Sequence, residues 1–217
     1  MTRKLAYGDP AVEIGRAAGD YGHDLIAMAT HGRGGLRRWV FGSVADKVIH
    51  ASDLPLLIVR PKQAPPQEAG AIRHLVVPLD GSALAETAIP VAQALAARLH
   101  IGVSLVQAIL QSAVLYDMAT VYDPRLDTEL EQMAKEYLHG VQGRFSQAGI
   151  NAGAVVRKGS PAFEVLDYAE ATPGALIVMT THGLGGAARW VFGSVADRVM
   201  RAAAAPVLML RSAREPA

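Results

Sequence analysis

A glycine-rich passage occurs twice in the chain, as THGRGGLRRWVFGSVADKV at residues 30–48 and as THGLGGAARWVFGSVADRV at residues 181–199. In each copy a Gly-Ser pair precedes a helical pattern, so a helix is expected to begin near Ser43 and near Ser194. The first turn of a helix presents free backbone N–H groups and a partial positive charge of about half a unit, which suits an anion such as phosphate. Glycine lets the backbone approach a ligand closely because it has no side chain. The passage therefore favours anion binding at a helix start.

Several side chains of the second passage leave more than one interpretation open. Ser194 and Asp197 have the Ser-x-x-Asp spacing of a capping box, so Ser194 could cap the helix, bind phosphate, or do both. His182 could contact phosphate or act as a general acid, since histidine titrates near neutral pH, but a loop histidine bonded to backbone is favoured. Arg189 could reach phosphate or be ion-paired, and Trp190 is expected to pack.

Other nucleotide and metal motifs fit the chain less well. The string GxxxxGK followed by Ser or Thr does not occur. Residues 183–188 have the dinucleotide form GxGxxA, but the first copy has Arg37 at the third small position, where bulk would prevent close helix packing. A nicotinamide cofactor is therefore disfavoured. The seven histidines lack the i, i+4 pairing of a zinc helix, and no pattern indicates a hydrolytic nucleophile.

The elements that position these residues belong to an internal repeat. An offset of 151 residues aligns Gly8 with Gly159 and continues without a gap to Arg60 and Arg211, with about half of the positions identical. The second copy is the longer one, and its apolar runs predict five strands that alternate with helices. This alternation is typical of an α/β protein with a parallel sheet covered on both faces. The predicted strands are 74–80, 101–110, 152–159, 175–179 and 206–210.

Helices are predicted between these strands. The first has apolar residues from Leu84 to Leu99 at helical spacing, and the second has them from Leu126 to Val141. Ser160 followed by proline marks the start of the third, and Ser194 opens the fourth. Asp80 lies in Asp-Gly-Ser at the carboxyl end of the first strand, where a turn role and a ligand role are both possible and the ligand role is favoured.

The first copy contains only the last part of this unit. Leu25–Met28 and Leu56–Val59 match the fourth and fifth strands, and nothing before them matches the first two strands and helices. Proline-rich residues 62–70 predict a linker, so we expect a partial unit at 1–61 and a complete unit at 71–212. Two strands alone leave a sheet edge and a face uncovered. The partial unit is therefore expected to dock on the complete one, to dimerise, or to be completed by a start lying upstream.

Composition narrows the class of protein. The 217 residues are 51% hydrophobic, which is enough to bury a core. Because 21 Lys and Arg nearly balance 20 Asp and Glu, without long runs of one sign, neither nucleic acid nor an anionic membrane is indicated as a partner. The lack of cysteine excludes disulfides, thiolate metal sites and a cysteine nucleophile. With no signal-like start and no long uncharged apolar run, a soluble cytoplasmic protein is expected.

These segments resemble those of the universal stress protein family. VVPLDGS at residues 76–82, the passage at 181–199 and PVLML at 206–210 occur in the order of that family's recurring segments, and the likeness covers nearly the whole chain. The resemblance implies an open parallel five-stranded sheet of order 3-2-1-4-5 with helices on both faces, like that of the adenine nucleotide alpha hydrolases. For one branch of the family it also implies ATP binding.

In that branch the site motif is Gly, two residues, Gly, nine residues, Gly, then Ser or Thr. Gly183, Gly193 and Ser194 match its later part, and the resemblance implies that they wrap the phosphates. Asp80 would contact the adenosine portion, and Ala108 would lie beside the base through its backbone. Mg²⁺ or Mn²⁺ would be bound through the phosphates. The implied cofactor-binding residues are Asp80, Ala108, Met179, Thr181, His182, Gly183, Gly193, Ser194 and Val195.

One departure from the motif leaves two functions in competition. Thr180 stands where the motif has its first glycine, and Ala29 stands there in the first copy. The favoured function is an ATP-binding universal stress protein with a regulatory or protective role and at most slow ATP hydrolysis. The alternative is a protein-interaction module of the same fold that binds no nucleotide. An ATP-dependent ligase is disfavoured, because its Ser/Gly-rich loop after the first strand is replaced here by the short DGSALAE.

The resemblance also implies self-association. Family members commonly pair through their fifth strands, so Leu56–Val59 is expected to pair with Val207–Leu210 within the chain, or two chains to pair as a homodimer. The first copy keeps Gly32 and Gly42 but has no counterpart of Asp80, so it is not expected to form a complete site alone.

Overall fold

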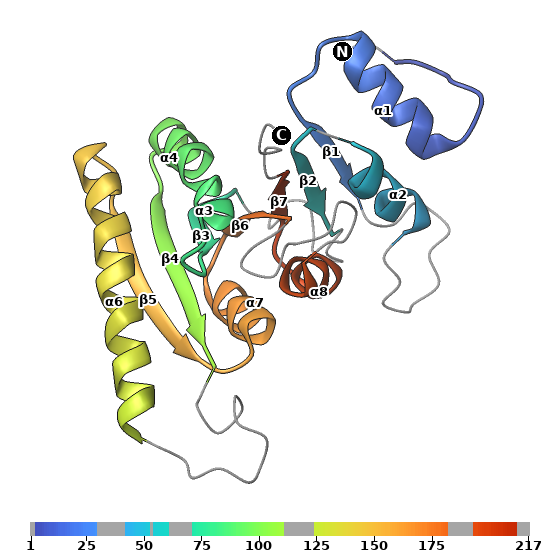
Figure 1. Cartoon of the computed structure of the whole chain (residues 1–217). Coiled ribbons are helices and arrows are strands. Elements are labelled where there is room, and N and C mark those ends of the chain that lie inside the picture. The colour runs from blue at the N-terminus through green and yellow to red at the C-terminus, as the bar shows by residue number, and fades with distance from the viewer. Residues whose placement is uncertain are drawn as a thin grey trace, which may run out of the picture.

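The computed structural model describes residues 3–29, 42–52, 54–60, 71–110, 124–181 and 193–211. These residues form an α/β structure around one sheet with helices on both faces (Figure 1). The strands are β1 (Ile26–Ala29), β2 (Leu56–Val59), β3 (His74–Pro78), β4 (Gly102–Ile109), β5 (Ala152–Lys158), β6 (Ala175–Thr180) and β7 (Val207–Leu210). Their order across the sheet is β1-β2-β7-β6-β3-β4-β5.

The five strands of the second copy have the predicted order. β5, β4, β3, β6 and β7 are neighbours and run parallel, which is the order 3-2-1-4-5. The sheet that the described residues form has seven strands, not the predicted five, because β1 and β2 extend it beyond β7. β2 pairs antiparallel with β7, so the sheet is mixed. Leu57 lies opposite Leu208, its equivalent in the other copy, and the pairing expected within the chain is thus present.

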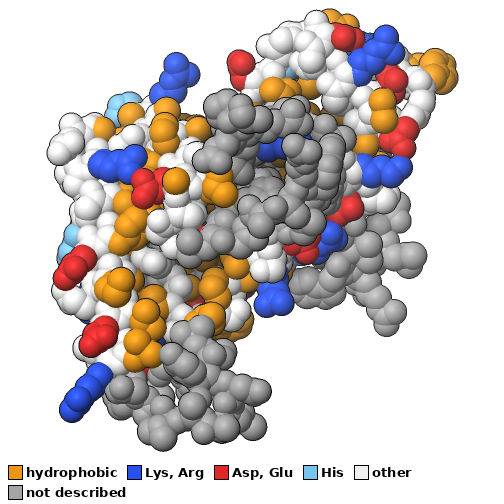
Figure 2. All heavy atoms as spheres, in the orientation of Figure 1, with side chains coloured by type: hydrophobic (Ala, Val, Ile, Leu, Met, Phe, Trp, Pro, Cys, Tyr) orange, Lys and Arg blue, Asp and Glu red, His pale blue; other side chains and the backbone are white. Residues whose placement is uncertain are grey.

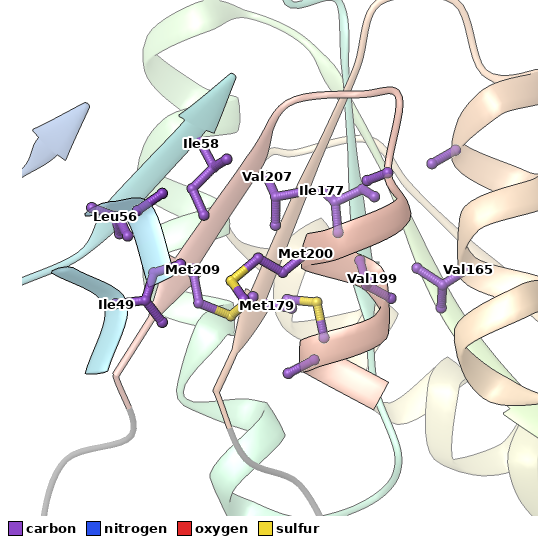
Figure 3. Packing of buried hydrophobic residues seen from close by; sticks show 14 of the residues in the cluster. Ile49, Leu56, Ile58, Val165, Ile177, Met179, Val199, Met200, Val207 and Met209 are labelled. Atoms are coloured by element: carbon purple, nitrogen blue, oxygen red, sulfur yellow. The ribbon is translucent and has the colours of Figure 1, made fainter. Parts of the chain in front are cut away.

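The helices divide into two layers. α1, α2, α7 and α8 pack on one face, over a core cluster that contains residues of both copies (Figure 3). α3, α4 and α6 pack on the other face, over a second cluster. The helices are α1 (Pro10–Asp20), α2 (Ser43–Ala51), α3 (Ala83–Glu86), α4 (Ala88–Leu99), α6 (Pro124–Gln147), α7 (Pro161–Ala171) and α8 (Ser194–Ala202).

The helix starts agree with the sequence in one case and differ in another. Ser160 is the N-cap residue of α7 and a proline occupies the first helical position, as predicted, but the Ser160 side chain makes no capping hydrogen bond. The capping box predicted at Ser194 is wrong. Gly193 is the N-cap of α8, its carbonyl accepts the first helical hydrogen bond, and no side chain caps the helix. Ser194 is already helical, and Gly42 similarly precedes α2.

Two helices differ in extent from the predicted ranges. The apolar stretch from Leu84 to Leu99 forms two helices, α3 and α4, which meet at Thr87. α6 has 24 residues and runs past the predicted range on both sides. In the part of the chain that the structure describes, no helix is both long and apolar enough to cross a membrane.

Candidate functional site

Backbone hydrogen bonds fix the start of α8 at the carboxyl edge of the sheet. Thr181 directly follows β6, and its N–H donates to the carbonyl oxygen of Leu210 in β7 at 2.9 Å. The carbonyl oxygen of Thr181 in turn accepts from the N–H of Gly193 at 3.0 Å. The two residues that flank positions 182–192 therefore meet beside the end of β6.

The first turn of α8 directs backbone N–H groups to this edge. The N–H of Asp197 donates to the carbonyl of Gly193 at 2.9 Å, so the N–H groups of Ser194, Val195 and Ala196 have no acceptor inside the helix. Ser194 is exposed and Val195 is half-buried. With the partial positive charge of the helix start, these groups suit an anion.

Asp80 lies two residues after β3, the strand beside β6, and so at the same edge. Its Oδ1 accepts from the N–H of Ser82 at 3.0 Å and from the Ser82 hydroxyl at 2.6 Å. That hydroxyl accepts from the N–H of Ala85 at 3.1 Å and caps α3. Gly81 has a φ of +84°, which favours glycine. The turn role of Asp80 is confirmed, and the ligand role stays a prediction.

Ala108 lies near the end of β4, the other neighbour of β3. The pairing of β3 with β4 ends at Val106, so β4 continues past the end of β3. The carbonyl of Val106 accepts from Leu79 on the β3 side, whereas that of Ile109 accepts from Gly159 on the β5 side. Because backbone groups alternate along a strand, those of Ala108 point over the end of β3, toward Asp80.

The last residues of β6 contribute mainly backbone to this edge. Met179 has 6% of its surface exposed and its side chain packs in the core (Figure 3). Thr180 and Thr181 are buried as well, at 4% and 6%. Thr180 has a negative φ, since His100 is the one non-glycine residue with positive φ in the described part of the chain. A threonine in place of the motif's first glycine therefore causes no backbone strain.

Two predicted site residues, His182 and Gly183, lie outside the described residues, as do Arg189 and Trp190. The other seven lie at the carboxyl ends of β3, β4 and β6 or in the first turn of α8. The structure therefore gathers the described members of the predicted set at one edge of the sheet.

The first copy borders this edge. A hollow beside Thr181 is lined by residues of α2, β2 and β7 and of the segments that directly follow α2 and β7, among them Val48 and Arg211. The Nη1 of Arg211 donates to the carbonyl oxygen of Ser52 at 2.7 Å, just after α2. The first copy of the repeat thus contacts the residues next to the predicted phosphate loop.

Two polar side chains near the edge were not identified from the sequence. The Oε1 of Gln107 is buried and has no hydrogen-bond partner in the described part of the chain, and the hydroxyl of Tyr137 is buried near the carboxylate of Glu86. Burial, and then the carboxylates of Glu86 and Asp80, raise the pKa of Tyr137. The helical spacing of apolar residues placed Tyr137 on the apolar side of α6, and nothing in the sequence indicated that its hydroxyl would lie near the site. Both residues lie close to the predicted adenosine end of the site.

The described geometry defines the class of protein. The chain proceeds from β3 through β4 to β5 on one side of the sheet and then crosses to β6 and β7, so the strand order reverses between β3 and β6. Doubly wound α/β proteins bind ligands at such a switch point, at the carboxyl ends of the strands. Asp80 and the start of α8 lie on either side of it. The family model of the universal stress proteins matches residues 2–60 and 71–211, and the chain belongs to this family.

Known relatives agree with this assignment. Universal stress protein Rv2005c of Mycobacterium tuberculosis is 29% identical over 219 residues, which cover 96% of this chain and 68% of that protein. Universal stress protein YxiE of Bacillus subtilis is 26% identical over 144 residues, which cover 63% of this chain and 97% of that protein. The structure of a universal stress protein from Archaeoglobus fulgidus superposes on this chain with a TM-score of 0.65 at 21% sequence identity. The superposition covers 97% of this chain and 68% of that protein.

Proposed function

We propose that residues 71–212 form a complete unit that binds ATP at the switch point between β3 and β6. Residues 1–61 form a partial unit of the same kind, joined to it by the linker 62–70. The observation that carries the proposal is the hydrogen bond from the N–H of Gly193 to the carbonyl of Thr181. It brings the start of α8 to the strand next to Asp80, so that phosphate donors and a carboxylate share one edge.

Each site residue has a role that its surroundings allow. The backbone N–H groups of Ser194 and Val195 bind the phosphates, and Gly193 permits their close approach. Asp80 contacts the adenosine portion, and the backbone of Ala108 lies beside the base. The side chains of Met179 and Thr181 are buried at the end of β6, and the backbone of Thr181 positions the start of α8 through its bonds to Leu210 and Gly193. His182 and Gly183 complete the phosphate loop. Mg²⁺ or Mn²⁺ accompanies the nucleotide as a ligand of its phosphates.

The biological role that follows is regulatory or protective. Backbone groups and one carboxylate hold the nucleotide, and the assigned residues include no activated nucleophile. The nucleotide is therefore a bound signal rather than a rapidly consumed substrate. ATP hydrolysis is therefore expected to be slow at most. We place this function in the cytoplasm, because a sequence without cysteine fits a reducing compartment.

The test is equilibrium binding of ATP to the full chain, with and without Mg²⁺, by isothermal titration calorimetry. Asp80→Ala and Gly193→Val should each weaken binding by about tenfold or more, which is about 1.4 kcal/mol. Gly42→Val is the matched control, because it makes the same change at the start of α2 in the first copy. That copy has no counterpart of Asp80. This control should leave the affinity unchanged.

Four results would contradict the proposal. Tight binding that survives both site substitutions would place the nucleotide elsewhere, and equal loss with Gly42→Val would mean that the first copy holds it. The absence of saturable binding would favour the interaction module, for which Thr180 in the motif is the supporting observation. Release of pyrophosphate from ATP would instead favour a ligase-like enzyme.

A further inference from the structure

Arg211 lies at the edge of the sheet where α8 begins. It directly follows Leu210, whose carbonyl oxygen accepts from the N–H of Thr181 at 2.9 Å. The carbonyl oxygen of Thr181 accepts in turn from the N–H of Gly193 at 3.0 Å, and Gly193 is the N-cap of α8. Thr181 alone therefore links the strand end that carries Arg211 to the start of α8.

The side chain of Arg211 extends to the first copy. Its Nη1 donates to the carbonyl oxygen of Ser52 at 2.7 Å. Ser52 is the C-cap residue of α2, and its N–H donates to the carbonyl of Val48. The last turn of a helix carries unpaired carbonyl groups and a partial negative charge, which a guanidinium neutralises. Arg211 therefore binds the negative end of α2 close to the positive end of α8.

Apolar side chains of both copies hold the end of α2 at this place. Ile49 and Leu56 of the first copy and Met209 of the second line the hollow beside the end of β6, where they lie close together (Figure 3). All three are buried, with at most 6% of their surface exposed. This packing fixes the end of α2 relative to β7, and with it the carbonyl group that holds Arg211.

The charge of Arg211 changes the electrostatics of an edge that has to accept a polyanion. None of the residues assigned to the ATP site is a lysine or an arginine, and one of them, Asp80, carries a negative charge. The negative end of α2 would further offset the positive end of α8. A guanidinium stays charged at every physiological pH, so Arg211 shifts the balance of this edge toward anions.

We infer that Arg211 makes the site favour a triphosphate over an uncharged ligand, and that the first copy holds it in place through Ser52. This inference rests on the proposed ATP site between β3 and β6. Because coupling between binding events is reciprocal, a bound triphosphate also stabilises the docking of α2 and β2. The first copy is then a regulatory part of the site, although it has no counterpart of Asp80.

The equivalent residue of the first copy, Arg60, provides the matched control. Arg60 follows β2 as Arg211 follows β7. Because β2 and β7 are antiparallel, Arg60 lies at the opposite edge of the sheet, away from the start of α8. The two arginines therefore share their place in the repeat but differ in their distance from the proposed phosphates.

The experiment measures the affinities of ATP and of adenosine for the full chain and its variants by isothermal titration calorimetry with Mg²⁺. Arg211→Met keeps an unbranched side chain but removes the charge, so it should weaken ATP binding by about fivefold or more. Adenosine has no phosphate, and its affinity should not change. Arg211→Lys should restore most of the ATP affinity because it keeps the charge. Arg60→Met should bind both ligands as the unmodified chain does.

Hydrogen exchange tests the reciprocal effect on the first copy. Saturating ATP should increase the protection of the amides of α2 and β2 in the unmodified chain, and should do so less in Arg211→Met at equal saturation. Circular dichroism should show that this variant remains folded.

Four outcomes would overturn the inference while leaving the ATP site intact. These are an unchanged ATP affinity in Arg211→Met, an equal loss of ATP and adenosine binding in that variant, an equal loss of ATP binding in Arg60→Met, and protection of α2 and β2 that ATP does not alter. The equal loss of both ligands would mean that Arg211 has a structural role only. If the unmodified chain does not bind ATP, the proposed function itself fails, and the inference fails with it.

Discussion

A partly buried chain of hydrogen bonds joins three side chains between the sheet and α7. The Nε2 of His74 lies 2.8 Å from the hydroxyl of Ser104, which lies 2.9 Å from the hydroxyl of Tyr168. The ring of His74 fits because Gly102, opposite it on β4, has no side chain, and a Cβ there would come within 3.2 Å of the ring. Burial lowers the pKa of His74 below its ordinary value of 6.5.

Acidification should destabilise the native state through His74. Since its pKa is lower in the folded chain, the unfolded chain binds the proton more tightly. The stabilisation by neutral His74 is complete above pH 6.5 and is lost as the pH falls through the lowered pKa. Urea denaturation across this range should show a falling midpoint, and His74→Gln should flatten the fall. The same change at exposed His139 is the control, and an unaltered pH profile in His74→Gln would contradict the argument.

At the scale of elements, local chemistry explains both the successes and the failures of the sequence analysis. The existence of the strands followed from apolar runs, whereas their order and the pairing of β2 with β7 were implied by the resemblance to the universal stress proteins. The break between α3 and α4 was missed, although Pro90 explains it, because a proline cannot donate to the fourth residue before it and clashes with that carbonyl. The buried hydroxyl of Tyr137 could not be predicted, since its position depends on how α6 packs against distant strands.

The turns that precede α7 and α1 allow a matched test at this scale. Gly159 has a φ of +148°, and a Cβ there would lie 2.5 Å from Oε1 of Glu164, whose carboxylate pairs with Arg157 at 2.8 Å. Gly8 has a φ of +146°, but its nearest neighbour, Glu13, is 3.4 Å away. Gly8→Ala should cost about 1–3 kcal/mol from backbone strain alone.

Gly159→Ala should cost more than Gly8→Ala, because it also displaces Glu164 from its ion pair. Chemical denaturation of the two variants and the parent gives the comparison directly. Equal costs, or a larger cost at Gly8, would show that the carboxylate moves aside freely.

At the scale of the whole molecule, one core and one sheet join the two copies. Arg201 of α8 donates to Asp46 of α2 and to Asp197 of its own helix, both at 2.8 Å, but exposed ion pairs contribute little stability. On the face shown in Figure 2, acidic and basic side chains are interspersed, which gives no large field of one sign. Apolar packing across β2 and β7 therefore carries most of the connection.

This arrangement predicts that the chain unfolds as one cooperative unit. Ile58 is 2% exposed and packs with Val207 and other core residues across the junction (Figure 3). Ile58→Ala should lower the free energy of unfolding by about 2–5 kcal/mol, because it leaves a cavity in the shared core. Val12→Ala, at a position 61% exposed, is the control and should stay within about 0.5 kcal/mol of the parent. In Ile58→Ala, hydrogen exchange should show that the amides of β2 and β6 lose protection together, since both strands border the same cluster. Loss of protection in β2 alone, with β6 unchanged, would mean that the partial unit opens independently and that the shared core does not couple the two copies.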